Sequence, residues 1–201
     1  MQNKAPAGYG FGQLPSVLTD PDSLDGTVDG IYHFYNSDNP IEGNDTGILV
    51  HYQGNFLSVS GQSKQIFYPG IQHNSHLERI FAGGWKPWEW VNPPMELGVE
   101  YRTTERYLGK PVYRFAFSTG KLASGINEFN PPIFAGSNCR VFRIDATDGY
   151  NLPILANHSQ LDGTWNIFIT EGSCGKVILF CGANQVGSSV DIVLHYTRVT
   201  D

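Results

Sequence analysis

Apolar and polar residues alternate over short stretches of this chain, with the two-residue period of β-strands that bury one face. Glycine, asparagine and serine separate these stretches, as they do at turns. In the first half of the chain the pattern predicts a meander of strands at residues 30–35, 47–52, 56–59, 64–68, 77–81 and 85–91. Residues 22–29 are polar and glycine-containing, and they are expected to form one helical turn or a tight turn.

A second series of strands is expected after residues 92–94, Asn-Pro-Pro. Two consecutive prolines lack backbone donors and interrupt a sheet, so this segment is expected to join two domains. Residues 99–107 and 110–118 flank Leu108-Gly109, and glycine supplies the positive φ of a tight hairpin turn. Further strands are expected at residues 140–145, 152–156, 164–170, 176–182 and 190–197.

The chain is therefore expected to be all-β, with a module of short strands followed by an antiparallel β-sandwich. Its 201 residues, with Gly 23 and Pro 12, suit two domains of about 100 residues rich in turns. The expected divisions are a connector at 1–21, a first module at 22–92 and a sandwich domain at 93–201.

Two strands carry information about packing. Residues 190–197 alternate, with Val190, Ile192, Leu194 and Tyr196 opposite the more polar positions, which predicts one buried face. Residues 176–181 are apolar on both faces, as in a strand covered on both sides. Either this strand is central, or its outer face meets another subunit.

Charge and composition exclude several classes of partner. The net charge is −6 and the isoelectric point about 5.4, and no cluster of Lys and Arg is present, so nucleic acid is not expected as a partner. No apolar run approaches the roughly 20 residues that cross a bilayer, and the first ten residues lack the apolar region of a secretory signal. We expect synthesis in the cytoplasm, no membrane insertion, and free thiols at Cys139, Cys174 and Cys181.

The residues suited to chemistry are scattered. His73 and His76 are the clustered pair of metal-capable side chains, but their spacing in a polar loop does not favour a metal site. The dipeptides Asp148-Gly149 and Asp162-Gly163 are typical of turns, and no Gly-x-Ser-x-Gly motif is present. We therefore expect no metal, no cofactor and no enzymatic activity. A glycosidase with two carboxylates across a groove stays an alternative.

Residues 81–113 read FAGGWKPWEWVNPPMELGVEYRTTERYLGKPVY. This string resembles the join between a pyocin-knob module and the tip of phage tail-fibre receptor-binding proteins, in which GVEYRTTERY-x-GKPVY recurs. Residues 5–13 (APAGYGFGQ) resemble the segment before the knob, residues 24–88 the knob itself, and residues 194–201 (LHYTRVTD) the closing strand of the tip. Fibres of phage-tail-like bacteriocins share the resemblance.

The resemblance implies a function in adhesion. It implies a homotrimer that follows an upstream tail-fibre shaft in the virion and attaches to a bacterial surface glycan or outer-surface protein. In resembling knobs the W-x-P-W pattern of Trp85 and Trp88 is structural, so we expect these rings and Trp90 to pack in the core or at a module interface. Stacking of a sugar on the rings is the alternative.

Receptor contact is expected in loops of the second domain, at residues 124–138, 147–151, 157–163 and 183–189. They combine amide, hydroxyl and carboxylate side chains with glycine. The candidate receptor-binding residues are Tyr150, Asn151, Asn157, His158, Gln160, Asp162, Asn184 and Gln185. Two alternatives to an adhesin remain, a surface-polysaccharide hydrolase and a structural spacer of the tail or baseplate without a ligand.

Overall fold

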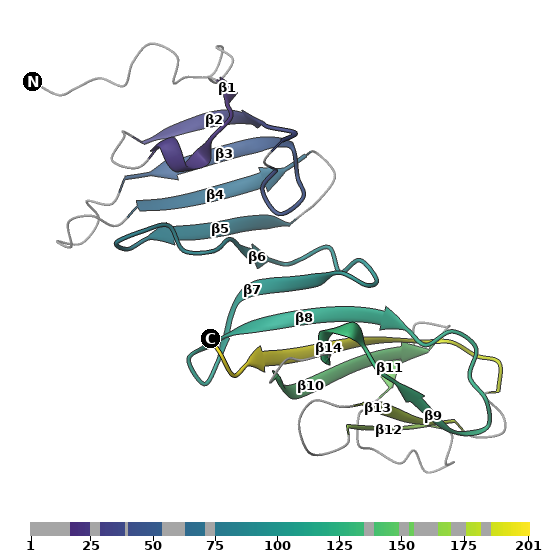
Figure 1. The fold of residues 1–201 in the computed structure, drawn as a ribbon. Coiled ribbons are helices and arrows are strands. Elements are labelled where there is room, and N and C mark those ends of the chain that lie inside the picture. The colour runs from purple at the N-terminus through teal and green to yellow at the C-terminus, as the bar shows by residue number, and fades with distance from the viewer. Residues whose placement is uncertain are drawn as a thin grey trace, which may run out of the picture. The chain divides into compact units, whose positions relative to one another are not determined.

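The computed structural model describes residues 17–24, 29–38, 40–53, 63–70, 75–134, 139–148, 153–154, 165–169, 176–181 and 186–201. The regular secondary structure in these ranges consists of β-strands and two short 3₁₀ turns, which confirms the all-β class (Figure 1). By its internal contacts the chain divides into two compact units, Met1–Pro94 and Met95–Asp201. Each unit is described by itself.

The first unit is built on one sheet in which strands next to each other in sequence pair with each other. β1 runs parallel to β2, and the following strands are antiparallel. The elements are β1 Val17–Leu18, the 3₁₀ turn η1 Pro21–Leu24, β2 Gly30–Tyr35, β3 Thr46–Tyr52, β4 Ser63–Pro69, β5 His76–Phe81 and β6 Glu89–Val91. The predicted strand at residues 56–59 lies outside the described residues.

One face of this sheet is the core of the first unit. Phe34 and Phe67 meet edge to face with ring centroids 5.4 Å apart, and Phe67 continues to Trp88 at 6.3 Å. Gly47 lies against this cluster, where an added Cβ would come within 2.5 Å of the Phe67 ring and 2.4 Å of the Tyr68 carbonyl oxygen. The aromatic packing therefore requires glycine at this point of β3.

The predicted strand at residues 85–91 is wrong in its first half, because pairing resumes only at Glu89–Val91. Pro87 has no backbone N–H to donate to a ladder. Residues 82–84 instead turn the chain, with the Ala82 N–H donating to the Gly84 carbonyl at 3.1 Å. Trp85 then pairs with Phe81 only as an isolated bridge.

The second unit has two sheets, in the orders β7-β8-β14-β10-β11 and β12-β13-β9. Its elements are β7 Glu100–Tyr107, β8 Lys110–Ser118, β9 Gly125–Phe129, the 3₁₀ turn η2 Pro132–Phe134, β10 Cys139–Asp148, β11 Pro153–Ile154, β12 Trp165–Ile169, β13 Val177–Cys181 and β14 Val190–Arg198. Phe115 and Ile192 of the first sheet and Leu179 of the second belong to one buried cluster. This is the predicted antiparallel β-sandwich. Cys139 and Cys181 are buried, Cys174 lies outside the described residues, and the free thiols stay a prediction.

β9 is a strand within residues 124–138, which were predicted to be a loop. Its residues alternate between half-buried and exposed, and its aliphatic residue, Ile126, is exposed. The usual sign of a strand, apolar residues turned inward at every second position, is therefore weak. β9 pairs with β13 from Val177↔Phe129 to Cys181↔Gly125.

β13 is the central strand of its sheet, between β12 and β9, which agrees with the first of the two predicted alternatives. Leu179 is fully buried, whereas Phe180 on the other face is 37% exposed.

β14 differs from its prediction, because His195 on the supposedly open face is only 4% exposed. The ring of Phe142, at a bulge in β10, lies beside it, and Tyr107 stacks on Phe142 with ring centroids 3.9 Å apart.

Candidate functional site

The loop residues predicted to contact a receptor fall outside the described part of the structure. These are Tyr150, Asn151, Asn157, His158, Gln160, Asp162, Asn184 and Gln185. They stay predictions from the sequence. The described residues contain three other arrangements of aromatic and polar side chains, each within one unit.

The first arrangement surrounds Arg79 in the first unit. Its guanidinium carbon lies 4.3 Å from the ring centroids of both Trp85 and Trp88. Its Nε donates to Gln65 Oε1 at 2.8 Å, and its Nη2 donates to Asp22 at 2.5 Å. Burial lowers the pKa of Arg79, and the Asp22 carboxylate opposes that shift.

This cluster gives the W-x-P-W pattern a structural role, because both of its rings contact a buried cation. Trp88 is only 9% exposed, and Trp90 is also buried. Packing, the expected role of these rings, is therefore confirmed for Trp88 and Trp90. Their faces are not open to a sugar.

The second arrangement joins two segments that resemble the fibre tip, the hairpin at residues 98–113 and the end of the chain at residues 194–201. Lys110 Nζ donates to the carbonyl oxygens of Arg198, Val199 and Asp201 at 3.1, 2.9 and 2.8 Å. Lys110 therefore fastens the C-terminal residues to the β7–β8 hairpin.

Stacked side chains continue this arrangement along the hairpin. The Arg198 guanidinium lies 4.6 Å from the centre of the Tyr113 ring and pairs with the Glu100 carboxylate. Tyr113 in turn stacks on Tyr196 with centroids 5.6 Å apart. Burial, and then the nearby Glu100 carboxylate, raise the pKa of Tyr196. The cations of this cluster bind partners within the unit, which indicates a structural role.

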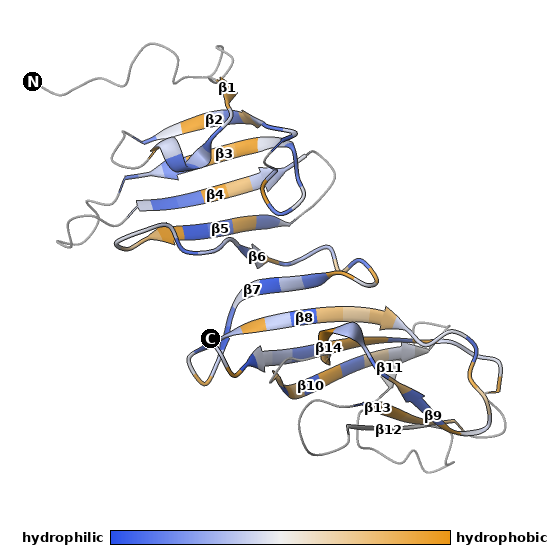
Figure 2. Cartoon of the chain, viewed as in Figure 1, coloured by the Kyte–Doolittle hydropathy of each residue, from blue (hydrophilic) through white to orange (hydrophobic). Residues whose placement is uncertain are grey.

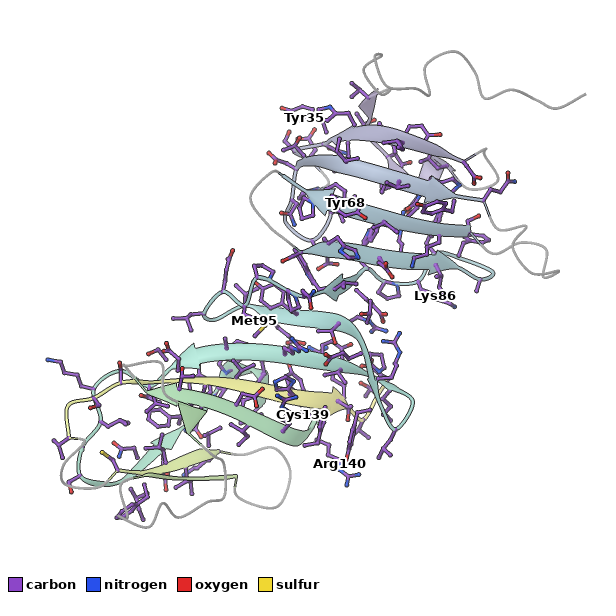
Figure 3. The ribbon with its side chains drawn as sticks, turned by 180° about the vertical axis from the view of Figure 1, so that it is seen from behind. Tyr35, Tyr68, Lys86, Met95, Cys139 and Arg140 are labelled. Atoms are coloured by element: carbon purple, nitrogen blue, oxygen red, sulfur yellow. The ribbon has the colours of Figure 1, made fainter. Side chains whose placement is uncertain are left out.

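The third arrangement is the outer face of the first sheet, which we define as the strand residues of β2 to β5 opposite the core. An antiparallel sheet with one face in water usually carries polar residues there. This face carries the ion pair of Lys64 and Glu78, but it also bears Ile31, Tyr35, Ile48, Tyr52, Tyr68 and Ile80, all exposed. Apolar residues recur along these strands in Figure 2, and Tyr35 and Tyr68 are labelled in Figure 3.

A hollow of about 790 Å³ lies at one end of the outer face. His33, Ile48 and Tyr68 line it from three adjacent strands, because His33 pairs with Ile48 and Ile48 with Tyr68. Residues 43–47 and Pro69-Gly70 complete the lining. Tyr68 also lies beside His76, with ring centroids 5.3 Å apart.

The turn that carries the polar lining is tightly held. Ile41 and Asn44 exchange backbone hydrogen bonds of 3.0 and 2.8 Å, and Glu42 and Gly43 have the positive φ values of 46° and 81° that the turn needs. The Asn44 Nδ2 donates to the carbonyls of Ile41 and Glu42 at 3.2 and 3.1 Å. Asp45 follows the turn, and its carbonyl accepts from the Asn36 N–H at 2.8 Å.

The hollow thus combines the aromatic ring of Tyr68, the aliphatic side chain of Ile48 and a rigid polar turn. This is the combination by which proteins bind the C–H face and the hydroxyls of a sugar. The sequence placed Tyr68 on a strand and residues 43–46 in a polar loop, but it carried no signal that they line one site. Among the described residues no three His, Cys, Asp or Glu side chains gather as metal ligands would, and His73 lies outside them.

Comparison with known proteins gives weak similarities. No family model matches the chain, and no curated protein matches it. An N-truncated R2-type pyocin tail fibre covers 92% of this chain and 96% of its own length, with 11% identity and a TM-score of 0.29. The C-terminal parts of R2 and R1 pyocin fibres of P. aeruginosa match at 10% and 11% identity, with TM-scores of 0.28 and 0.26.

The two C-terminal fragments cover 96% and 91% of this chain and 69% and 66% of their own lengths. The chain is similar to these tail fibres, but identities and TM-scores this low do not establish a shared fold. Within its described part the chain has no helix long and apolar enough to cross a membrane.

Proposed function

We propose that this protein is a receptor-binding part of a phage tail fibre, or of a phage-tail-like bacteriocin fibre, that attaches to a bacterial surface without catalysis. The observation that carries the proposal is the pairing of the two tip-like segments. The hairpin at residues 98–113 and the end at residues 194–201 each resemble a tail-fibre tip in sequence. They lie together through Lys110, Tyr113 and Arg198.

An adhesive role also agrees with the exposed aromatic residues. A spacer without a ligand gains nothing from Tyr35 and Tyr68 on an open sheet face, since exposed apolar patches promote association. Rings next to an amide and a carboxylate favour a ligand with hydroxyls over an apolar one. A surface glycan therefore fits better than an outer-surface protein, which stays the second candidate partner.

The proposed assembly is a homotrimer that continues an upstream tail-fibre shaft. Three copies of a weak site, on several fibres of one particle, raise avidity by about 10²- to 10⁴-fold without tight individual contacts. Non-covalent attachment then suffices, and the protein needs neither a catalytic group nor a cofactor.

Incubation with surface polysaccharide purified from a strain that binds the protein tests the proposal against the hydrolase alternative. An adhesin retains the polysaccharide on immobilised protein and leaves its chain length unchanged on a sizing column. Shortened chains would overturn the non-catalytic role.

Substitution in the predicted tip loops tests the proposal against the spacer alternative. The variant Tyr150→Ala/Asn157→Ala/Gln185→Ala is expected to lose cell binding and to keep its thermal unfolding midpoint, since loop side chains contribute about 0.5 kcal/mol or less. If this variant and Tyr68→Ala both bind cells as the wild type does, neither the predicted tip loops nor the outer face of the first sheet recognises the receptor.

A further inference from the structure

The hollow on the outer face differs from the loops predicted to bind the receptor, and it lies in the other unit. Its floor crosses β2, β3 and β4 at His33, Ile48 and Tyr68. Neighbouring strands are about 4.8 Å apart, so this floor is roughly 10 Å wide. One pyranose ring fits on a floor of that width, with Tyr68 to stack against it.

Asn44 and Asp45 offer hydrogen-bond acceptors in the hollow, and the hydroxyls of Thr46 and Tyr68 can both donate and accept. Both N–H groups of the Asn44 amide are directed to the carbonyls of Ile41 and Glu42, which leaves its Oδ1 as an acceptor. The Asp45 side chain is exposed and supplies a carboxylate. A ligand that matches these atoms must donate hydrogen bonds, as sugar hydroxyls do.

Charge restricts the ligand further. Among the described residues that line the hollow, Asp45 is the only one with a permanent charge, and none is Lys or Arg. A carboxylate or phosphate on the ligand would be repelled by Asp45 and would find no cation to pair with. An acidic sugar is therefore a poor occupant, and an uncharged one is favoured.

The backbone that carries Asn44 and Asp45 is held in place before any ligand binds. The paired backbone hydrogen bonds of Ile41 and Asn44 fix the turn, and the bond from Asn36 to the Asp45 carbonyl ties it to the end of β2. A rigid site loses little conformational entropy on binding, so even one sugar residue can be held measurably.

We propose that this hollow binds one uncharged pyranose residue, with the Tyr68 ring stacked on its C–H face and Asn44 and Asp45 accepting from its hydroxyls. The inference rests on the proposed function in one respect only, that the pyranose belongs to a bacterial surface glycan. The proposed site gives the first unit a binding role of its own, in addition to the role predicted for the tip loops.

Saturation-transfer NMR on the full chain tests the site. The probes are the methyl glycosides of glucose, galactose, mannose and N-acetylglucosamine, with methyl glucuronide as the acidic member. At least one uncharged glycoside should receive saturation, mostly at ring protons of one face, and should bind more tightly than methyl glucuronide. No signal from any uncharged probe, or a preference for the glucuronide, would overturn the proposal.

The chain offers a matched control, because Tyr52 and Tyr68 are each 44% exposed and lie on the same sheet face. Tyr52 does not line the hollow. Tyr68→Ala should weaken sugar binding about tenfold, the effect of losing one aromatic contact, and Tyr52→Ala should leave it unchanged. Equal losses in both variants would contradict the proposed location. Asp45→Ala, on the exposed turn, gives the same test if Tyr68→Ala fails to fold.

Light scattering and cell binding distinguish the sugar site from an interface between copies and from the tail-fibre role. If light scattering shows assembly that Tyr68→Ala abolishes, the outer face is an interface between copies and the sugar site is wrong. If the protein binds a sugar but no bacterial cell, the tail-fibre role fails and the sugar site stands. If it binds cells but no uncharged glycoside, the tail-fibre role stands and the sugar site fails.

Discussion

The guanidinium of Arg79 lies 4.3 Å from the centre of the Trp88 ring, which also meets the ring of Phe67 in the core with centroids 6.3 Å apart. Trp88→Ala removes that stacking surface and leaves a cavity next to Phe67. We expect a loss of about 3 to 5 kcal/mol in the free energy of unfolding, as for other large aromatic truncations in a core. Chemical denaturation monitored by tryptophan fluorescence measures it.

Lys86 is the control for this variant, because it is exposed and lies in the same W-x-P-W segment (Figure 3). Lys86→Ala should change the free energy of unfolding by no more than about 0.5 kcal/mol. If Trp88→Ala were as harmless, the rings would have a role other than packing.

Lys110 should hold the end of the chain against the hairpin. Lys110→Met removes three hydrogen bonds from a charged donor, so we expect a loss of about 1 to 3 kcal/mol. Amide hydrogen exchange should become faster at residues 199–201. Lys121→Ala, at an exposed position in the same unit, should leave both quantities unchanged. Unchanged exchange in Lys110→Met would mean that the end of the chain is held by other contacts.

His195 should make stability depend on pH. Burial lowers its pKa, with Arg114 and Arg143 adding to the shift, while the Asp145 carboxylate at 2.9 Å opposes it. The unfolded chain, with a histidine pKa of about 6.5, then binds the proton more readily than the folded protein. The stability that the neutral, buried His195 contributes is therefore complete above about pH 6.5 and is lost as the pH falls below that value.

The thermal unfolding midpoint should therefore decrease as the pH is lowered from about 7.5 to 5.5. The decrease should be less steep in His195→Gln than in the wild type. Comparison of the two slopes removes the contribution of the other histidines. Identical slopes would show that His195 does not change its protonation on unfolding.

The oligomeric state is a further prediction. Light scattering should give about three times the monomer mass of 22.2 kDa. The resemblance to trimeric fibres and the partly exposed outer side of β13, with Phe180 beside Ile126, support it. A monomer at micromolar concentration would contradict it for this chain.

Much of the fold follows from two-residue periodicity. Strands such as β2, β3 and β4 lie within one residue of their predicted bounds, because each alternates around a buried row. β9 was not predicted, because its aliphatic residue Ile126 faces outward and the alternation of buried apolar residues is weak. The strand predicted from residue 85 was too long because Pro87 stops pairing. The burial of His195 depends on the bulge at Phe142, which periodicity does not encode.

The candidate site was harder to predict than the fold. Alternation assigns Tyr68 and Phe67 to opposite faces of β4, but it does not say which face a core covers. The hollow also needs the turn after Ile41 to lie beside the ends of β3 and β4, which is a tertiary arrangement. The sequence therefore contained each residue of the site without indicating that they meet.

Cell binding tests the central claim most directly. The fluorescently labelled full chain should be retained by some strains of a panel of bacteria and not by others. Its binding should saturate, and excess unlabelled protein should compete with it. Tryptophan fluorescence establishes beforehand that the labelled protein is folded. Retention by no strain, or equal and unsaturable retention by all of them, would contradict the proposal that this protein is a receptor-binding part of a tail fibre.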